Sequence, residues 1–338
     1  MTPNVLPNMK VRSPRWHDLL DVRTIDSSGD PQADLKEPTY ENVEVGELFG
    51  PEVLPLTQYR AMRYDFIMGS RNALSGVTGS NNSPLAHPGS FSNELFEIYT
   101  LNYAASKIVG VHASEEIWLE QAASVGENIV LSGEFVEKYE KRGQGYAVVS
   151  GEARDQAGNL LARRLGTEIM RTVPGDVVGR KASSGSSARR MDTTVDRSAR
   201  RVGPNANNFS PGDWFEFDPH LVTFEQAALY SRFGEYVTSI HGSMEAAQSA
   251  GLKVPIVQGQ QQMCLLLDGF FSLIGPRFHS GGHIAAKFIG PVRVFSELTL
   301  QGRVFSCDGT PSTTRFECWL TDETGRTVTV ATAEWTEK

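Results

Sequence analysis

Apolar side chains in the last third of the chain recur first at helical and then at strand spacing. Residues 263–274 are almost entirely apolar, and the largest side chains stand three and four positions apart, which is typical of a helix buried on all sides. Apolar and polar residues then alternate through 298–304, 316–320 and 328–330, as in strands with one buried face. The motif Asp-Glu-Thr-Gly at 322–325 predicts a hairpin turn between the last two strands.

The first half of the chain repeats this order of elements. Phe91, Leu95 and Ile98 have helical spacing, and Ile129 and Leu131 alternate with polar residues in a later strand. A long buried helix followed by an antiparallel meander is the element order of the hot-dog fold, in which a sheet wraps around the helix and buries its apolar surface.

Short motifs also recur at a nearly constant distance along the chain. Residues 46–64 and 212–230 share a Gly-acid pair, a Thr and a Tyr at an offset of 166, and segments further along match at offsets of 169 and 167. Offsets that vary so little over a long stretch predict a duplicated domain. We therefore expect an α+β protein with a double hot-dog architecture, in which two hot-dog units are fused in one chain.

The composition divides the chain into four segments. Residues 1–40 are polar and rich in turn-forming residues, which predicts an N-terminal extension. Residues 174–205 are rich in Ser and Arg and carry few large apolar side chains, which predicts a basic, solvated linker. We place the first hot-dog unit at 41–173 and the second at 206–338.

Composition and charge exclude several classes of protein. Of the 338 residues, 40% are hydrophobic and 21% are charged, and the net charge is −8 at pH 7. This acidic balance argues against a nucleic-acid-binding protein, and the lack of an apolar run of about 18 residues argues against a membrane-spanning helix. The N-terminal residues do not form the apolar core of a signal peptide, and the three cysteines have no CxxC spacing. We expect a cytoplasmic protein with free thiols and no bound metal.

The segment 221–263 combines the residues that carry candidate chemistry. Tyr230 is followed by Gly234, His241, an Ala-rich stretch and the motif Pro-Ile-Val-Gln-Gly at 255–259. This segment resembles the MaoC-like dehydratases and (R)-specific enoyl-CoA hydratases, in which a Pro-Ile-Val-x-Gly motif opens the hot-dog helix. The resemblance implies hydration or dehydration of an acyl thioester, an enoyl or 3-hydroxyacyl group on coenzyme A or an acyl carrier protein. It also implies that the phosphopantetheine arm lies along the seam between the two halves, without a metal, nicotinamide or flavin cofactor.

The catalytic carboxylate departs from the family pattern. The family's Asp stands five residues before its His, and that position here is Tyr236, whose phenol is not a base at neutral pH without a large pKa depression. Glu235 stands one residue earlier, and its longer side chain would offset a one-residue bulge in the loop. The resemblance therefore implies His241 and Glu235 as the catalytic pair, with Tyr236 as the alternative to Glu235.

Addition of water to an α,β-unsaturated thioester needs three kinds of group. A base takes a proton from water and an acid protonates the α-carbon, and a carboxylate and a neutral imidazole can share these steps. Backbone N–H groups at a helix start can hold the enolate charge on the thioester oxygen. Gly259 stands at that start, where the lack of a side chain lets the thioester approach the backbone. Further residues expected to line the substrate pocket are Tyr230, Tyr236, Ser239, Gln258 and His87.

The repeat also predicts an asymmetric enzyme. The counterpart of His241 falls within 71–75, where the sequence Arg-Asn-Ala-Leu-Ser offers no imidazole or carboxylate, so we expect one active site, in the second half. Three alternatives stay open: a hot-dog enzyme adapted to cyclisation, isomerisation or another elimination, a thioesterase, and a non-catalytic thioester-binding module. We expect the double unit to form a homodimer.

Overall fold

The computed structural model describes residues 35–69, 74, 76–79, 82–104, 110–141, 143–170, 191–231, 239–308 and 312–337. The first half contains β1 (Leu48–Pro55), α1 (Gln58–Met68), β2 (Leu85–Ala86), α2 (Gly89–Phe96), η3 (Ile98–Leu101), β3 (Val111–Leu119), β4 (Ala123–Ser124), β5 (Asn128–Lys141), β6 (Gln144–Arg154) and β7 (Leu160–Met170). The second half contains β8 (Trp214–Glu216), β9 (His220–Leu221), α3 (Phe224–Ser231), α4 (Met244–Ser249), α5 (Gly259–Ile274), η6 (Pro276–His279), β10 (Gly282–Phe288), β11 (Glu297–Asp308), β12 (Thr313–Thr321) and β13 (Thr327–Thr336).

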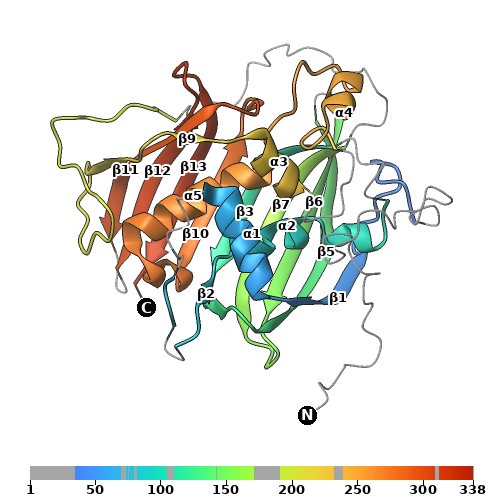
Figure 1. The fold of residues 1–338 in the computed structure, drawn as a ribbon, viewed down its shortest axis with the longest axis horizontal. Helices are drawn as coiled ribbons and strands as arrows, with labels where there is room; N and C mark the ends of the chain where they lie inside the picture. The colour runs from blue at the N-terminus through green and yellow to red at the C-terminus, as the bar shows by residue number, and fades with distance from the viewer. Residues whose placement is uncertain are drawn as a thin grey trace.

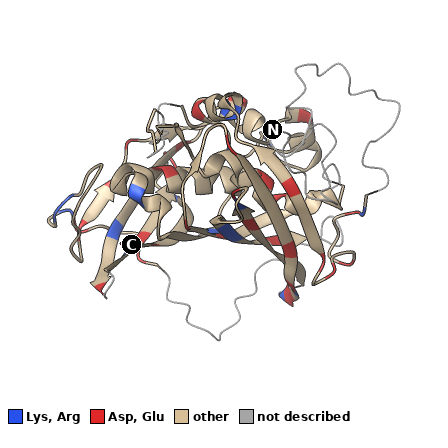
Figure 2. Cartoon of the chain, turned by 90° about the horizontal axis from the view of Figure 1, so that it is seen from below, with Lys and Arg blue, Asp and Glu red and all other residues tan. Residues whose placement is uncertain are grey.

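One large antiparallel sheet curves around two central helices, α2 and α5 (Figures 1 and 2). Among the described residues the strand order is β1-β5-β6-β7-β3-β10-β13-β12-β11-β8, with β9 beside β11 and a separate pair formed by β2 and β4. The first five strands come from the first half and the next five from the second. The order within one half mirrors the order within the other, as expected for a duplicated unit.

The helix predicted at 263–274 is confirmed as the greater part of α5. Nearly all residues of α5 are buried, because the sheet covers one side of the helix and the first half covers another. Gly275 ends the helix with a φ of 80°, a left-handed conformation that glycine adopts without a steric penalty. The strands predicted at 298–304, 316–320 and 328–330 are confirmed within β11, β12 and β13.

The central helix of the first half is shorter. α2 has 8 residues where α5 has 16, and the chain continues beyond Glu97 as the 3-10 turn η3. Leu95 and Ile98, expected on one helix, are both fully buried. Both side chains therefore pack in the core as expected, although α2 ends between them.

The two halves are joined within the sheet by the seam, the antiparallel pairing of β3 with β10. The seam extends from Ser114 opposite Lys287 to Leu119 opposite Gly282. Ile117 and Ile284 face each other near its middle and are 1% and 0% exposed. Backbone hydrogen bonds and buried apolar side chains thus hold the halves together across the seam.

The described end of the predicted linker packs against the second half. Arg200 forms an ion pair with Asp213, and Arg197 lies 2.8 Å from Glu216. Val202 is buried, and its N–H donates to the carbonyl of Trp214 at 2.8 Å. Residues 174–190 lie outside the described residues, so the solvated linker stays a prediction for that part.

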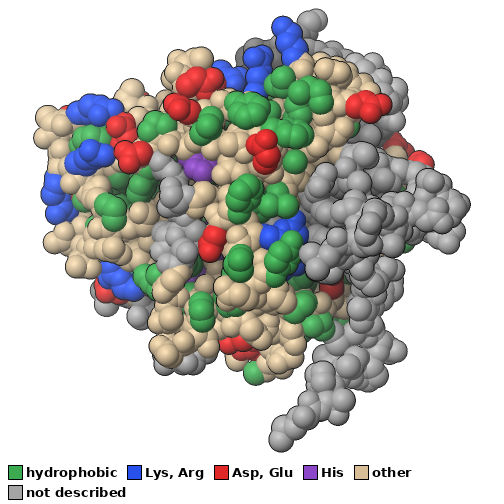
Figure 3. All heavy atoms as spheres, viewed as in Figure 1, with side chains coloured by type: hydrophobic (Ala, Val, Ile, Leu, Met, Phe, Trp, Pro, Cys, Tyr) green, Lys and Arg blue, Asp and Glu red, His purple; other side chains and the backbone are tan. Residues whose placement is uncertain are grey.

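The surface of α1 carries exposed apolar side chains on the face of the molecule seen in Figure 3. Tyr59, Met62 and Phe66 are each more than half exposed and share one side of the helix, while Tyr64 and Ile67 on the other side are buried. Within the part of the chain that the structure describes, no helix combines the length and the apolar character that crossing a membrane requires.

The seam predicts that the two halves associate without a covalent link. Chains of residues 1–180 and 181–338, expressed together, should purify as one complex, because the pairing of β3 with β10 does not depend on the intervening peptide. Size-exclusion chromatography measures the association. The matched control is Ile284→Asp in the second chain, which places a charge in the seam and should abolish co-purification. Halves that elute separately without the substitution would show that the seam is insufficient.

Candidate active site

The start of α5 is fixed by the strap, residues 255–258. The N–H of Val257 donates to the carbonyl of Val292 at 2.8 Å, and the N–H of Ile256 donates to the carbonyl of Ile240 at 3.2 Å. One bond ties the strap to the segment after β10, and the other ties it to the loop that carries His241. The strap therefore sets the position of this loop relative to the first turn of α5.

Among the described residues, no side chain caps the start of α5. Gln258 occupies the N-cap position without a side-chain hydrogen bond, and the first turn contains no acidic residue. In contrast, Thr57 accepts a bond from Arg60 N–H at the start of α1, and Ser243 accepts one from Ala246 N–H at the start of α4. The first N–H groups of α5 and the positive end of its dipole are thus placed to receive negative charge.

His241 is bonded to the strap that leads into α5. Its Nδ1 is 2.7 Å from the carbonyl oxygen of Ile256. A carbonyl only accepts, so Nδ1 carries the proton and Nε2 carries the lone pair. Ile256 stands three residues before Gly259, so this bond ties the imidazole to the segment that enters α5. Ser239, a predicted pocket residue, supports the loop by accepting a bond from His241 N–H at 3.3 Å.

Burial keeps the His241 ring in its neutral form at pH 7. It lowers the pKa of the imidazole to about 4, and the hydrogen bond to the Ile256 carbonyl, which favours the protonated ring, offsets only part of this effect. The ring is therefore neutral at pH 7, with Nε2 able to accept a proton. The catalytic role of His241 stays a prediction.

His87 stands two residues before α2, in the segment that corresponds to the strap before α5. Its Nδ1 accepts a hydrogen bond from the N–H of Gly89 at 3.0 Å, so a side chain already satisfies the first amide of α2. The ring stacks on Tyr64 with 4.7 Å between centroids, and Nε2 is 3.8 Å from Oδ1 of Asp268. Burial, with a smaller effect of His279, holds the pKa of His87 well below its ordinary value. The first N–H of α2 is thus already bonded to a histidine of the same half.

The remaining predicted residues are distributed around α5. Gln258 is 8% exposed, and its Oε1 has no hydrogen-bond partner among the described residues. Tyr230 is fully buried on α3, where its hydroxyl lies 3.3 Å from Sγ of Cys264. Burial raises the pKa of Tyr230 well above its ordinary value, so it is a neutral phenol at pH 7. Glu235 and Tyr236 lie outside the described residues, and the choice between them stays a prediction.

Two glutamines that the sequence analysis did not single out also lie at the start of α5. Gln260 and Gln261 are each 1% exposed, and neither side-chain amide has a hydrogen-bond partner in the described part of the chain. A buried amide without a partner is costly unless a ligand or water satisfies it. The signal in the sequence is a run of three glutamines at the start of an otherwise apolar helix. The third glutamine, Gln262, accepts a hydrogen bond from the Thr329 hydroxyl at 2.6 Å.

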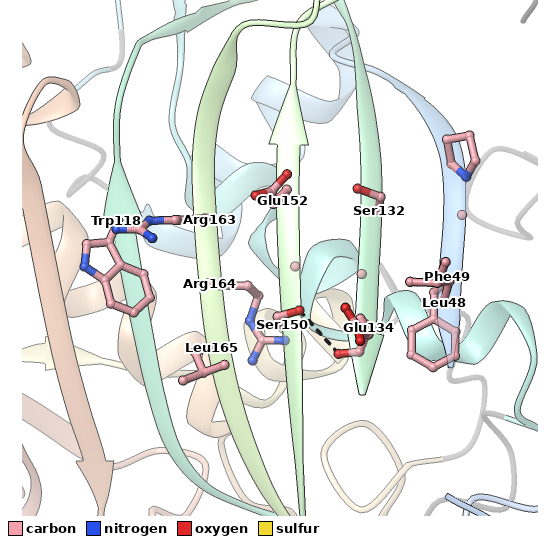
Figure 4. Close-up of a pocket in the computed structure, with 14 residues that line it drawn as sticks. Leu48, Phe49, Trp118, Ser132, Glu134, Ser150, Glu152, Arg163, Arg164 and Leu165 are labelled. Atoms are coloured by element: carbon pink, nitrogen blue, oxygen red, sulfur yellow. Dashed lines mark hydrogen bonds between the residues drawn. The ribbon is translucent and has the colours of Figure 1, made fainter. Parts of the chain in front are cut away.

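A separate hollow of 640 Å³ lies on the first half of the sheet (Figure 4). It is lined by residues of β1, β5, β6 and β7 and by Trp118 of β3. The guanidinium of Arg163 lies 4.6 Å from the centre of the Trp118 indole. None of the predicted site residues lines this hollow, so it is distinct from the site at the start of α5.

The architecture confirms the expected fold class. Two halves of equivalent strand order share one sheet around their central helices, which is a double hot-dog fold. This is the fold of the MaoC-like dehydratases.

This chain is similar to several solved structures in its fold, at low sequence identity. A solved MaoC-like dehydratase superposes with a TM-score of 0.67 at 15% identity, over 89% of this chain and 100% of that chain. A MaoC domain dehydratase from Chloroflexus aurantiacus gives 0.67 at 11% identity, over 93% and 100%. A Mycobacterium tuberculosis protein described as a double hotdog gives 0.60 at 16% identity, over 89% and 98%. No family model and no curated protein matches the sequence.

The buried histidines predict a loss of stability in mild acid. Burial lowers the pKa of His241 and His279 to about 4, whereas histidines of the unfolded chain titrate near pH 6.5. Between about pH 6.5 and 4 the unfolded state therefore binds more protons than the folded state. The melting temperature should decrease as the pH is lowered through this range. Glu168, whose pKa burial raises to about 7, acts in the opposite sense.

The contribution of one imidazole can be isolated with His279→Phe, which removes a ring that packs 4.5 Å from Phe271 and has no hydrogen-bond partner among the described residues. Thermal denaturation at pH 8, 7, 6 and 5 should show a shallower dependence for the variant than for the wild type. An equal slope for both proteins would contradict the assigned protonation state of His279.

Proposed function

We propose that this protein adds water to an enoyl thioester, or removes it from the corresponding 3-hydroxyacyl thioester. The observation that carries the proposal is the neutral imidazole of His241, oriented by Ile256 beside the uncapped start of α5. A neutral base next to helix N–H groups suits a reaction in which water loses a proton while negative charge develops on a thioester oxygen. The fold shared with solved dehydratases supports the assignment.

The proposed hydration begins when Nε2 of His241 takes a proton from water. The water oxygen bonds to C3, and the electron pair of the double bond moves toward the thioester, so that the carbonyl oxygen becomes an enolate. N–H groups at Gly259 and the first turn of α5 hold this charge. A carboxylic acid then protonates the α-carbon, and the proton on His241 returns to the carboxylate. We assign the carboxyl group to Glu235, with Tyr236 as the alternative acid.

The substrate is proposed to be carried on coenzyme A or on the phosphopantetheine of a carrier protein. The phosphopantetheine arm contains amide groups that both donate and accept hydrogen bonds. The amides of Gln260 and Gln261 at the start of α5, which have no hydrogen-bond partner in the part of the chain that the structure describes, suit such groups. The arm would then lie close to the seam, as the resemblance in sequence implies.

Crotonyl-CoA separates this function from its alternatives. Loss of the enoyl absorbance without release of thiol supports a hydratase. Release of free thiol indicates a thioesterase, and binding without either signal indicates an adapted enzyme or a binding module. Each of the last two results would overturn the proposal.

Replacement of the proposed base should abolish most of the activity. His241→Gln keeps a side chain of similar size that cannot take a proton, and kcat should fall by about 10² to 10⁴-fold, the usual effect of losing a positioned base. Glu235→Gln should have a comparable effect, whereas Tyr236→Phe should have it if the tyrosine is the acid. Circular dichroism checks that each variant is folded. A His241→Gln protein with wild-type kcat would contradict the assignment.

A further inference from the structure

A β-bulge lies near the start of β3. The register advances by two residues in β3, from His112 to Ser114, while the partner strand β7 advances by one, so Ala113 is an extra residue. Side chains alternate along a regular strand, and without the bulge His112 would share a face with Ser114. The bulge instead turns His112 to the face of Glu115, on the helix side of the sheet.

The inward-facing ring of His112 is held by a buried ion pair. Nε2 lies 3.0 Å from Oε2 of Glu115 and 3.1 Å from the carbonyl of Ser114, two acceptors, so Nε2 carries the proton. Arg164 binds both carboxylate oxygens of Glu115, with Nε 2.7 Å from Oε1, and both side chains are almost fully buried. Burial alone would raise the pKa of Glu115, but Arg164 and His112 bring it below its ordinary value, so the carboxylate is charged.

The other ring nitrogen, Nδ1, faces the start of α5. A Cβ on Gly259 would lie 2.9 Å from Nδ1 and 3.0 Å from the ring of Phe288. The space left by the missing side chain, which was expected to admit the thioester, is thus taken by the imidazole and the Phe288 ring. Phe96 and Phe288 flank the imidazole, with 4.3 and 4.6 Å between ring centres. The side chain of His112 is 9% exposed, and its Nδ1 has no hydrogen-bond partner among the described residues. Nδ1 is therefore a buried acceptor that lacks a donor.

The second half of the chain provides an internal comparison. Gly110 and His112 have counterparts in Gly281 and His283, at an offset of 171. β10 keeps a regular register with both neighbouring strands, and His283 lies on the outer face, stacked on Trp118 at 4.7 Å between ring centres. Both repeats carry a Gly-x-His motif, but only the motif with the bulge directs its imidazole to a helix start.

We propose that His112 is a second active-site imidazole, contributed by the first half, that accepts a hydrogen bond from the reacting water or from the 3-hydroxyl group of the substrate. This inference rests on the proposed function. Water has two O–H groups, and one donates to Nε2 of His241 while the other donates to Nδ1 of His112, which directs an oxygen lone pair at C3. Glu115 and Arg164 are positioning residues, because they act through the ring of His112. The active site then spans the seam.

Steady-state kinetics with crotonyl-CoA test this role. His112→Gln should lower kcat by about 10²-fold with little change in KM, because the water loses its orientation while thioester binding is retained. His283→Gln is the matched control, since it removes the equivalent histidine from the outer face, and it should retain wild-type kcat. An unchanged kcat in His112→Gln, or an equal loss in His283→Gln, would overturn the proposal.

A second measurement does not depend on turnover. With ¹⁵N-labelled histidine, saturation with butyryl-CoA, which has no double bond to hydrate, should shift the NMR signal of His112 Nδ1 and leave that of His283 in place. A shift in a protein that does not hydrate crotonyl-CoA would refute the proposed function and keep the ligand site at His112. Hydration that persists in His112→Gln, without a shift in the wild type, would refute the role of His112 and keep the function.

The positioning role of the ion pair has its own readout. The double variant Glu115→Gln with Arg164→Gln removes both charges, so neither is left unpaired in the core. Burial lowers the pKa of His112, the hydrogen bond and charge of Glu115 raise it, and the charge of Arg164 has a smaller lowering effect. Because Glu115 has the larger effect of the two, the double variant should show a net fall in that pKa by NMR titration, together with a lower kcat. An unchanged pKa of His112 in the folded variant would show that the pair serves folding alone.

Discussion

The pairing of β3 with β10 determines which side chains surround the start of α5. The helix belongs to the second half of the chain, yet the strand that brings His112 to it belongs to the first half. Phe288 reaches the same point from β10, so the two sides of the seam meet over Gly259. Because the backbone hydrogen bonds of a sheet fix both register and face, the seam positions these groups more firmly than a contact between separate surfaces would.

Some of the ionisable side chains buried around the two central helices form ion pairs. Arg164 with Glu115 and Arg60 with Glu94 are buried ion pairs on the first half. A buried charge is tolerated only where a partner offsets the loss of hydration, so these pairs hold their strands and helices in one arrangement. The amides of Gln260 and Gln261 have no such partners in the described structure. The contrast is the reason for assigning the glutamine amides, rather than the ion pairs, to the proposed binding of the substrate.

Periodicity and repetition predicted the parts of this protein that obey regular spacing. The helix at 263–274, the strands that follow it and the position of Gly259 at a helix start could all be derived from patterns in the sequence. His112 could not, because one extra residue in β3 reverses the face of the side chain before it, and the sequence around Ala113 carries no mark of a bulge. The Gly-x-His motif of both repeats was the available signal. It does not distinguish the inward-facing ring from the outward-facing one.

Duplication alone would give two equivalent helix starts, and three local differences remove that equivalence. α2 has half the length of α5, its first amide is bonded to His87, and the strand of the second half lacks the bulge that turns His112 inward. Each difference is small, but all three act in the same direction. One helix start is closed by the chain's own side chain, while the other is left uncapped and supplied with imidazoles from both halves. In the proposed function the two units combine into one site, to which the first half contributes His112 although the first amide of its own helix α2 is bonded to His87.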